Sequence, residues 1–115
     1  MLTIKQKPTL SFECLPSFQE GYLDVDNNHK IYYEQYGNPN GKPILFLHGG
    51  PGAGFSNSHK AFFDPKIFRV IFFDQRGAGK SVPYSETEDN NTQSLIEDIE
   101  SLRIFLKIDS WYIFG

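Results

Sequence analysis

The chain has 115 residues, enough for one small domain at most, and its residues are 39% hydrophobic, 16% aromatic and 22% charged. Disordered chains are poor in aromatic residues, so this composition predicts a folded protein. The net charge is −3 and the positive residues are scattered, which excludes the basic surface of a nucleic-acid-binding or anionic-membrane-binding protein. The longest apolar runs have four residues, whereas a membrane-spanning helix needs about 20.

The first half of the chain predicts an irregular lead-in followed by a β-hairpin. Residues 1–20 contain Pro8 and Pro16 and show no periodicity. Residues 21–26 and 29–36 then alternate apolar and polar side chains on either side of an Asx-rich turn. Two alternating runs joined by such a turn indicate an antiparallel pair of strands. We therefore expect the folded domain to span residues 21–115.

Three later segments predict strands that are covered on both faces. Residues 43–47, 68–73 and 111–114 are apolar almost throughout, which is typical of strands in a parallel sheet. A candidate helix at residues 56–63 lies between the first two runs and should end near Asp64-Pro65.

A second, clearer helix is expected from about Thr92 to Lys107, between the last two strands. Asn90, Asn91 and Thr92 offer N-cap side chains. An apolar stripe follows at steps of three and four: Leu95, Ile96, Ile99, Leu102, Phe105 and Leu106. Asp98 is expected on the opposite, polar side. The order hairpin, strand, helix, strand, helix, strand predicts an α/β fold in which parallel βαβ units follow an antiparallel hairpin.

The segment after the first apolar strand is rich in glycine and reads His48-Gly-Gly-Pro-Gly-Ala-Gly54. Glycines at the end of a buried strand let backbone N–H groups approach a ligand, so the segment could hold a phosphate or form an oxyanion hole. A dinucleotide fingerprint needs a third glycine where Phe55 stands, which counts against a nucleotide site.

A second motif follows the strand at 68–73 and reads Asp74-Gln-Arg-Gly-Ala-Gly-Lys-Ser81. Its last three residues imitate a phosphate-binding P-loop, but Asp74 stands where that loop needs glycine, and its carboxylate would repel phosphates. Ser81 is not in a G-x-S-x-G nucleophile elbow, so we reject it as a nucleophile.

Together these segments resemble the proline iminopeptidases, serine peptidases of the α/β-hydrolase class. The resemblance rests on His48-Gly-Gly-Pro-Gly52, on Phe72-Phe-Asp-Gln-Arg-Gly-Ala-Gly-Lys-Ser81, and on the run from Asn91-Thr92 to Trp111-Tyr-Ile-Phe-Gly115. It covers residues 20–115, and it implies the N-terminal half of an α/β-hydrolase sheet. It also implies release of N-terminal proline from peptides through a serine in a Gly-Gly-Ser-Trp-Gly elbow, of which Gly115 would be the first glycine.

The resemblance assigns roles to residues on the two loops. The backbone N–H of Gly50 would be one oxyanion-hole donor, Gly49 and Gly52 would shape its loop, and His48 and Pro51 would support it. Asp74 and Arg76 would act as structural supports beside the active site. We also expect a cis Gly50–Pro51 bond, since the chain must reverse while the Gly50 N–H faces the site.

The same resemblance implies an enzyme that needs no cofactor or metal and acts on a peptide with an N-terminal proline. The serine, aspartate and histidine of the family's triad and its cap would lie beyond Gly115. The chain is thus expected to be cut at the elbow and inactive alone. The single Cys14, which excludes an internal disulfide, and the lack of a secretory signal suggest the cytoplasm.

Two alternatives remain open at this point. The chain could belong to another α/β-hydrolase such as an esterase or an epoxide hydrolase, because the fold hosts many activities. It could also be a non-catalytic interaction fragment that contributes strands to another chain. The nature of the nucleophile separates the first alternative from a peptidase, since epoxide hydrolases use aspartate.

Overall fold

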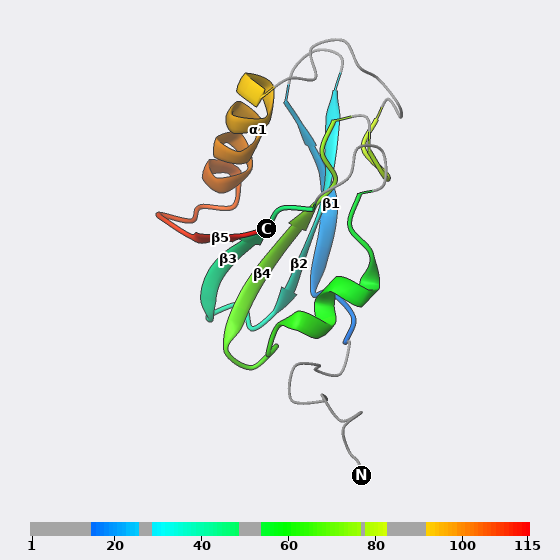
Figure 1. Cartoon of the computed structure of the whole chain (residues 1–115). Helices are drawn as coiled ribbons and strands as arrows, with labels where there is room; N and C mark the ends of the chain where they lie inside the picture. The colour runs from blue at the N-terminus through cyan, green and yellow to red at the C-terminus, as the bar shows by residue number, and fades with distance from the viewer. Residues whose placement is uncertain (1–14, 26–28, 49–53, 77, 83–91) are drawn as a thin grey trace.

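The computed structural model describes residues 15–25, 29–48, 54–76, 78–82 and 92–115. The described residues form a five-stranded sheet with the strand order β1-β2-β4-β3-β5. Helix α1 lies on one side of this sheet and the short helix η2 on the other (Figure 1). The fold is therefore an α/β sandwich, as the sequence predicts.

The hairpin predicted for the first half of the chain is present. Strands β1 (Gln19–Asp24) and β2 (Lys30–Gly37) pair antiparallel in the register Gly21↔Tyr33. Strand β1 begins two residues before the boundary expected at residue 21, because Gln19 and Glu20 already pair with Gln35 and Glu34. The other side of β2 pairs antiparallel with β4, so the hairpin continues the sheet.

The three apolar runs form the parallel part of the sheet. Strand β3 (Lys42–Phe46) pairs parallel with β4 (Phe68–Phe73) on one side and with β5 (Tyr112–Phe114) on the other. Residues 112–114 therefore lie beside residues 44–46. The carboxyl ends of β3 and β4 consequently meet at the same edge of the sheet, and each is followed by one of the two loop motifs.

The alternation along each strand divides the core into two clusters. One cluster lies under α1 and consists of Ile31, Tyr33, Leu45, Ile71, Phe73, Leu102 and Ile108. The other lies on the η2 side and consists of Tyr36, Phe46, Phe63, Val70 and Phe72. Because both faces of β3 and β4 are covered, residues 43–46 and 70–73 are apolar without interruption.

Helix α1 (Thr92–Phe105) is present, but its apolar stripe is narrower than predicted. Leu102 is fully buried, whereas Ile96 and Phe105 are each about half exposed. Asp98, expected on the polar side, is buried. The helix ends two residues before the predicted Lys107, because Lys107 adopts a left-handed conformation with φ 59° that cannot continue a right-handed helix.

The first predicted helix exists as the 3-10 helix η2 (Asn57–Phe62). Ser56 begins it in an extended conformation, and Asp64-Pro65 follows its end. Lys60 and Phe63 face the sheet and are buried, which makes η2 the cover of the second cluster.

Candidate active site

His48 is the last described residue before the glycine-rich segment, and it is held by Gln75. The backbone N–H of Gln75 donates to His48 Nε2 at 3.2 Å, and the Gln75 side-chain amide donates to the His48 carbonyl oxygen at 2.9 Å. The two hydrogen bonds fix the ring and the backbone of His48 at the start of the glycine-rich segment.

Gly49, Gly50, Pro51 and Gly52 lie outside the described residues. Their roles as oxyanion donor and loop glycines, and the cis Gly50–Pro51 bond, therefore stay predictions. The structure resumes at Gly54 and Phe55, immediately after this segment.

Asp74 holds the far end of the glycine-rich segment. Its side chain is buried, and its two oxygens accept hydrogen bonds from the backbone N–H groups of Phe55 at 2.9 Å and Lys80 at 2.8 Å. Gly54 and Gly79 pack directly on the carboxylate with positive φ angles of 74° and 52°. A side chain at either glycine would collide with it. Asp74 thus connects the residue after the glycine-rich segment with the loop that follows β4.

Arg76 contacts helix α1. Its guanidinium forms a buried, two-pronged ion pair with Asp98 on α1, with Nε–Oδ2 at 2.7 Å and the second N–H···O bond at 2.9 Å. Such pairs fix orientation as well as charge. Arg76 therefore ties the loop after β4 to α1.

The buried Ser81 closes the same loop. Its hydroxyl accepts a hydrogen bond from the Tyr32 backbone N–H at 2.9 Å and donates to the backbone carbonyl of Asp74. Both interactions use the hydroxyl internally, so the structure supports the rejection of Ser81 as a nucleophile.

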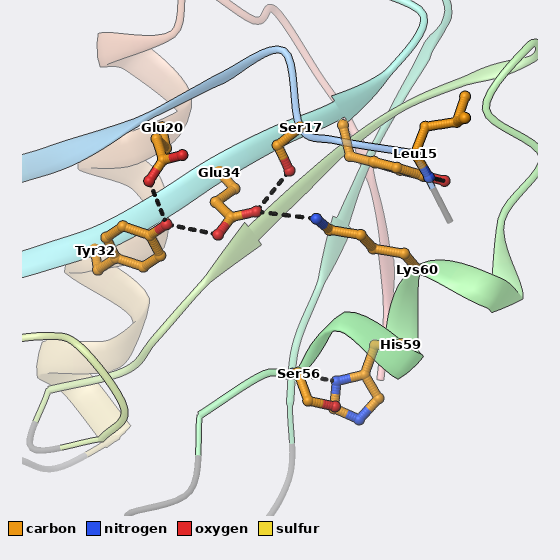
Figure 2. A network of polar contacts seen from close by, with 9 residues as sticks. Leu15, Ser17, Glu20, Tyr32, Glu34, Ser56, His59 and Lys60 are labelled. Carbon is orange, nitrogen blue, oxygen red and sulfur yellow. Dashed lines mark hydrogen bonds and ion pairs between the residues drawn. The ribbon is translucent and has the colours of Figure 1, made fainter. Parts of the chain in front are cut away.

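A polar network lies on the η2 side of the sheet, between β1, β2 and η2 (Figure 2). The Tyr32 hydroxyl is 2.9 Å from Glu20 and 2.5 Å from Glu34. Glu34 also accepts a hydrogen bond from Ser17 and forms an ion pair with buried Lys60 at 3.3 Å. Burial, followed by the hydrogen bonds and charges of Glu34 and Glu20, raises the pKa of Tyr32, so the phenol remains a donor.

The charge state of Glu34 follows from the same network. Burial by itself raises the pKa of this carboxyl, but hydrogen bonds from Ser17 and Tyr32 and the charge of Lys60 outweigh it. The pKa of Glu34 therefore lies below its ordinary value, and the side chain is a carboxylate at neutral pH.

A pocket of about 280 Å³ opens beside this network, lined among others by Tyr32, Glu34, Phe55, Asp74 and Lys80. Both oxygens of Asp74 and of Glu34 are already occupied by hydrogen bonds or ion pairs within the chain. The two acids thus have structural partners instead of facing the pocket unpaired. The pocket's lining residues come from β2 and from the segments that follow β3 and β4.

Among the described residues, no group of three or more His, Cys, Asp or Glu side chains could hold a metal ion. No helix in the described part of the chain is long and apolar enough to cross a membrane. The described residues therefore hold the glycine-rich segment at both ends. Gln75 binds His48 before the segment, and Asp74 binds Phe55 after it, at the edge of the sheet where β3 and β4 end.

A model of the family described as alpha/beta hydrolase fold matches residues 42–115. The chain belongs to the alpha/beta hydrolase family. A protein named "Probable proline iminopeptidase" from Leptolyngbya boryana is 53% identical over 104 residues, which cover 90% of this chain and 32% of the relative. The chain spans about a third of the length of the curated relatives it matches.

Two solved structures share the hydrolase fold with this chain, each at 28% sequence identity. A proline iminopeptidase-related protein from Thermus thermophilus has a TM-score of 0.68, covering 83% of this chain and 34% of its own. A structure described under novel epoxide hydrolases in metagenomes from hot environments has a TM-score of 0.69, covering 85% of this chain and 33% of its own. The predicted fold and the predicted resemblance to proline iminopeptidases are both confirmed.

Two residues of this hydrolase framework were missed by sequence reasoning. Gln75 lies between the two predicted supports, Asp74 and Arg76, but an uncharged side chain there gave no chemical signal. Asp98 was assigned to the polar side of its helix from periodicity alone. A buried arginine needs a partner, so the question of what neutralises Arg76 could have pointed to an acid on α1.

Proposed function

We propose that this hydrolase chain provides the oxyanion-hole part of a prolyl aminopeptidase that releases N-terminal proline from peptides. The observation that carries the proposal is the 53% identity to the Leptolyngbya boryana relative over 90% of the chain. The anchoring of His48 by Gln75 and of Phe55 by Asp74 supports it, because the segment between them is the one expected to supply the donor.

In the proposed reaction, a serine attacks the carbonyl carbon of the N-terminal proline residue. The Gly50 N–H would donate to the oxygen on which negative charge develops, and a second donor would follow the nucleophile. The peptide would then leave and water would release proline from the acyl-enzyme. The serine elbow, the triad and the cap would come from other segments of the enzyme, and the 115 residues alone are expected to be inactive. The single Cys14 supports a cytoplasmic setting.

A grafted enzyme tests this proposal. The matching third of the Leptolyngbya boryana relative is replaced by this chain, and hydrolysis of a proline arylamide is measured beside the unmodified relative and the isolated chain. We expect turnover by the graft, none by the isolated chain, and loss of turnover when the elbow serine is changed to alanine. A folded graft that does not exceed background, next to an active relative, would contradict the proposal.

An epoxide hydrolase is the second candidate, because one structural neighbour carries that description at a TM-score of 0.69. The graft takes its serine nucleophile from the relative, so this alternative is tested on the full-length protein given an epoxide such as styrene oxide, where we expect no diol formation. Diol formation together with an inactive arylamide assay would favour this alternative.

A further inference from the structure

We infer that Gln75 is a positioning residue that sets the direction in which the chain leaves β3 and enters the glycine-rich segment. The inference rests on the function proposed above and adds a residue to it. Gln75 contacts His48 twice, once through the backbone N–H to Nε2 and once through the side-chain amide to the carbonyl oxygen. The two contacts bind both the ring and the backbone of one residue.

The sheet places these partners side by side. The parallel register pairs Phe46 with Phe72, so the chain two and three residues further on reaches the same edge from both strands. His48 is only 4% exposed, which shields the hydrogen bonds from water. Any residue except proline could donate the backbone hydrogen bond, whereas the bond to the carbonyl oxygen depends on the Gln75 side chain.

The hydrogen bond to the carbonyl matters because a peptide unit is planar. The His48 carbonyl and the Gly49 N–H share one plane, so an amide that holds the carbonyl also fixes the orientation of that plane. Only the two backbone dihedrals of Gly49 then separate the fixed plane from the peptide unit that carries the Gly50 N–H. Glycine has the least restricted backbone dihedrals, so Gly49 by itself does not fix the direction of the Gly50 N–H. That direction therefore depends on how the His48 carbonyl is held. On the other side of the segment, the Asp74 carboxylate accepts a hydrogen bond from the Phe55 N–H.

The test compares Gln75→Met with Gln93→Met in the grafted enzyme. Methionine keeps the length of glutamine and removes the amide, and Gln93 is an exposed glutamine on α1 that contacts Glu97. We expect Gln75→Met to lower kcat by about 10- to 100-fold with KM within about threefold, because misplacement of a transition-state donor affects turnover more than binding. Gln93→Met should leave both unchanged. Unchanged kcat in Gln75→Met would overturn the inference.

Hydrogen–deuterium exchange tests the role of Gln75 without relying on peptidase activity. If the unsubstituted graft is folded but inactive on proline arylamide, the proposed function fails and the inference is decided by exchange alone. Peptides that cover residues 44–56 should then exchange faster in Gln75→Met than in Gln93→Met, with the rest of the chain unchanged. Equal exchange in the two variants would overturn the positioning role.

Discussion

At the scale of single residues, the organising group is the buried carboxylate of Asp74. Its two oxygens accept hydrogen bonds from the backbone N–H of Lys80, which follows Gly79, and from that of Phe55, which follows the glycine-rich segment. Gly54 and Gly79 are glycines because the carboxylate occupies the space that a Cβ would need. The motif that imitates a P-loop in sequence is therefore built around an acid that accepts backbone N–H groups, the reverse of an anion site.

Substitution of Gly50 tests the proposed oxyanion donor. Gly50→Pro removes the N–H, whereas Gly50→Ala keeps it, so the pair separates the donor from the shape of the loop. In the grafted enzyme we expect Gly50→Pro to lower kcat by about 10²- to 10³-fold, with a smaller effect on KM. Gly50→Ala should lose far less. Circular dichroism checks that both variants are folded, and near-normal kcat in folded Gly50→Pro would show that the donor lies elsewhere.

The Glu34 network predicts a pH-dependent contribution to stability. The pKa of Glu34 is lowered in the folded protein, so its contribution is present above the ordinary value of 4.5 and is lost as the pH falls below it. Glu34→Gln cannot ionise. The apparent Tm of the grafted enzyme should therefore exceed that of Glu34→Gln most clearly at pH 7, and the difference should shrink as the pH falls below about 4.5.

Glu97→Gln provides the control for this pH series, because Glu97 is exposed on α1. Its Tm difference from the unsubstituted graft should be small throughout. A gap for Glu34→Gln that stays constant or widens toward low pH would contradict the assignment of Glu34 as a bound carboxylate.

At the scale of elements, the Arg76–Asp98 pair connects the loop after β4 with helix α1. The two side chains are 7% and 3% exposed, so water does not compensate either charge when its partner is lost. The pair therefore explains why an acid occupies a buried helix position that periodicity assigns to solvent. It also means that α1 and the loop beside the proposed site are held in one arrangement.

Breaking this pair should be much more damaging than removing both charges. Removal of one partner from a buried pair costs about 3–5 kcal/mol, whereas replacement of both by apolar groups can be nearly neutral. We expect Asp98→Leu and Arg76→Met each to lower the apparent Tm of the grafted enzyme by several degrees, and the double variant to recover much of the loss.

Glu100→Gln is the matched control, since the Glu100–Arg103 pair on the same helix is largely exposed. Exposed pairs contribute at most about 1 kcal/mol. Losses from Asp98→Leu no larger than those from Glu100→Gln, or fully additive losses in the double variant, would contradict the coupling.

At the scale of the whole molecule, the described sheet ends at an apolar edge. Strand β5 pairs with β3 on one side, and its residues Tyr112 and Ile113 are 69% and 56% exposed. The Leu47 N–H donates to the Phe114 carbonyl, so in the alternating pattern of a parallel pair the backbone groups of Ile113 face away from β3. Exposed apolar edges of this kind recruit other strands.

We therefore expect the isolated 115-residue chain to associate through β5. Size-exclusion chromatography over a concentration series should show growing assemblies, and Ile113→Lys should shift the chain toward the monomer because a charge at an edge opposes pairing. Ile104→Lys, which removes an equally apolar and exposed side chain from α1, should not. A monomer at high concentration without any substitution would contradict the edge argument.

Much of the fold follows from local pattern. Period-two alternation predicts the hairpin and continuous apolar runs predict the parallel strands, because burial of one or both faces acts directly on the side chains of each strand. The predictions that were wrong concern the end of helix α1 and the burial of Asp98, which a local pattern does not determine. Helix α1 stops at Phe105, before the left-handed Lys107, and Asp98 is buried because Arg76, twenty-two positions earlier, reaches it.

The sequence by itself determined the family, the hairpin and parallel strands, and the two loop motifs that border the proposed site. Only the tertiary structure decided how those motifs are joined, with Gln75 on His48 and Asp74 on Phe55. The physical reason is that hydrogen bonds between loops depend on where two parallel strands end relative to one another. That register is set by packing across the sheet, and no short stretch of residues encodes it.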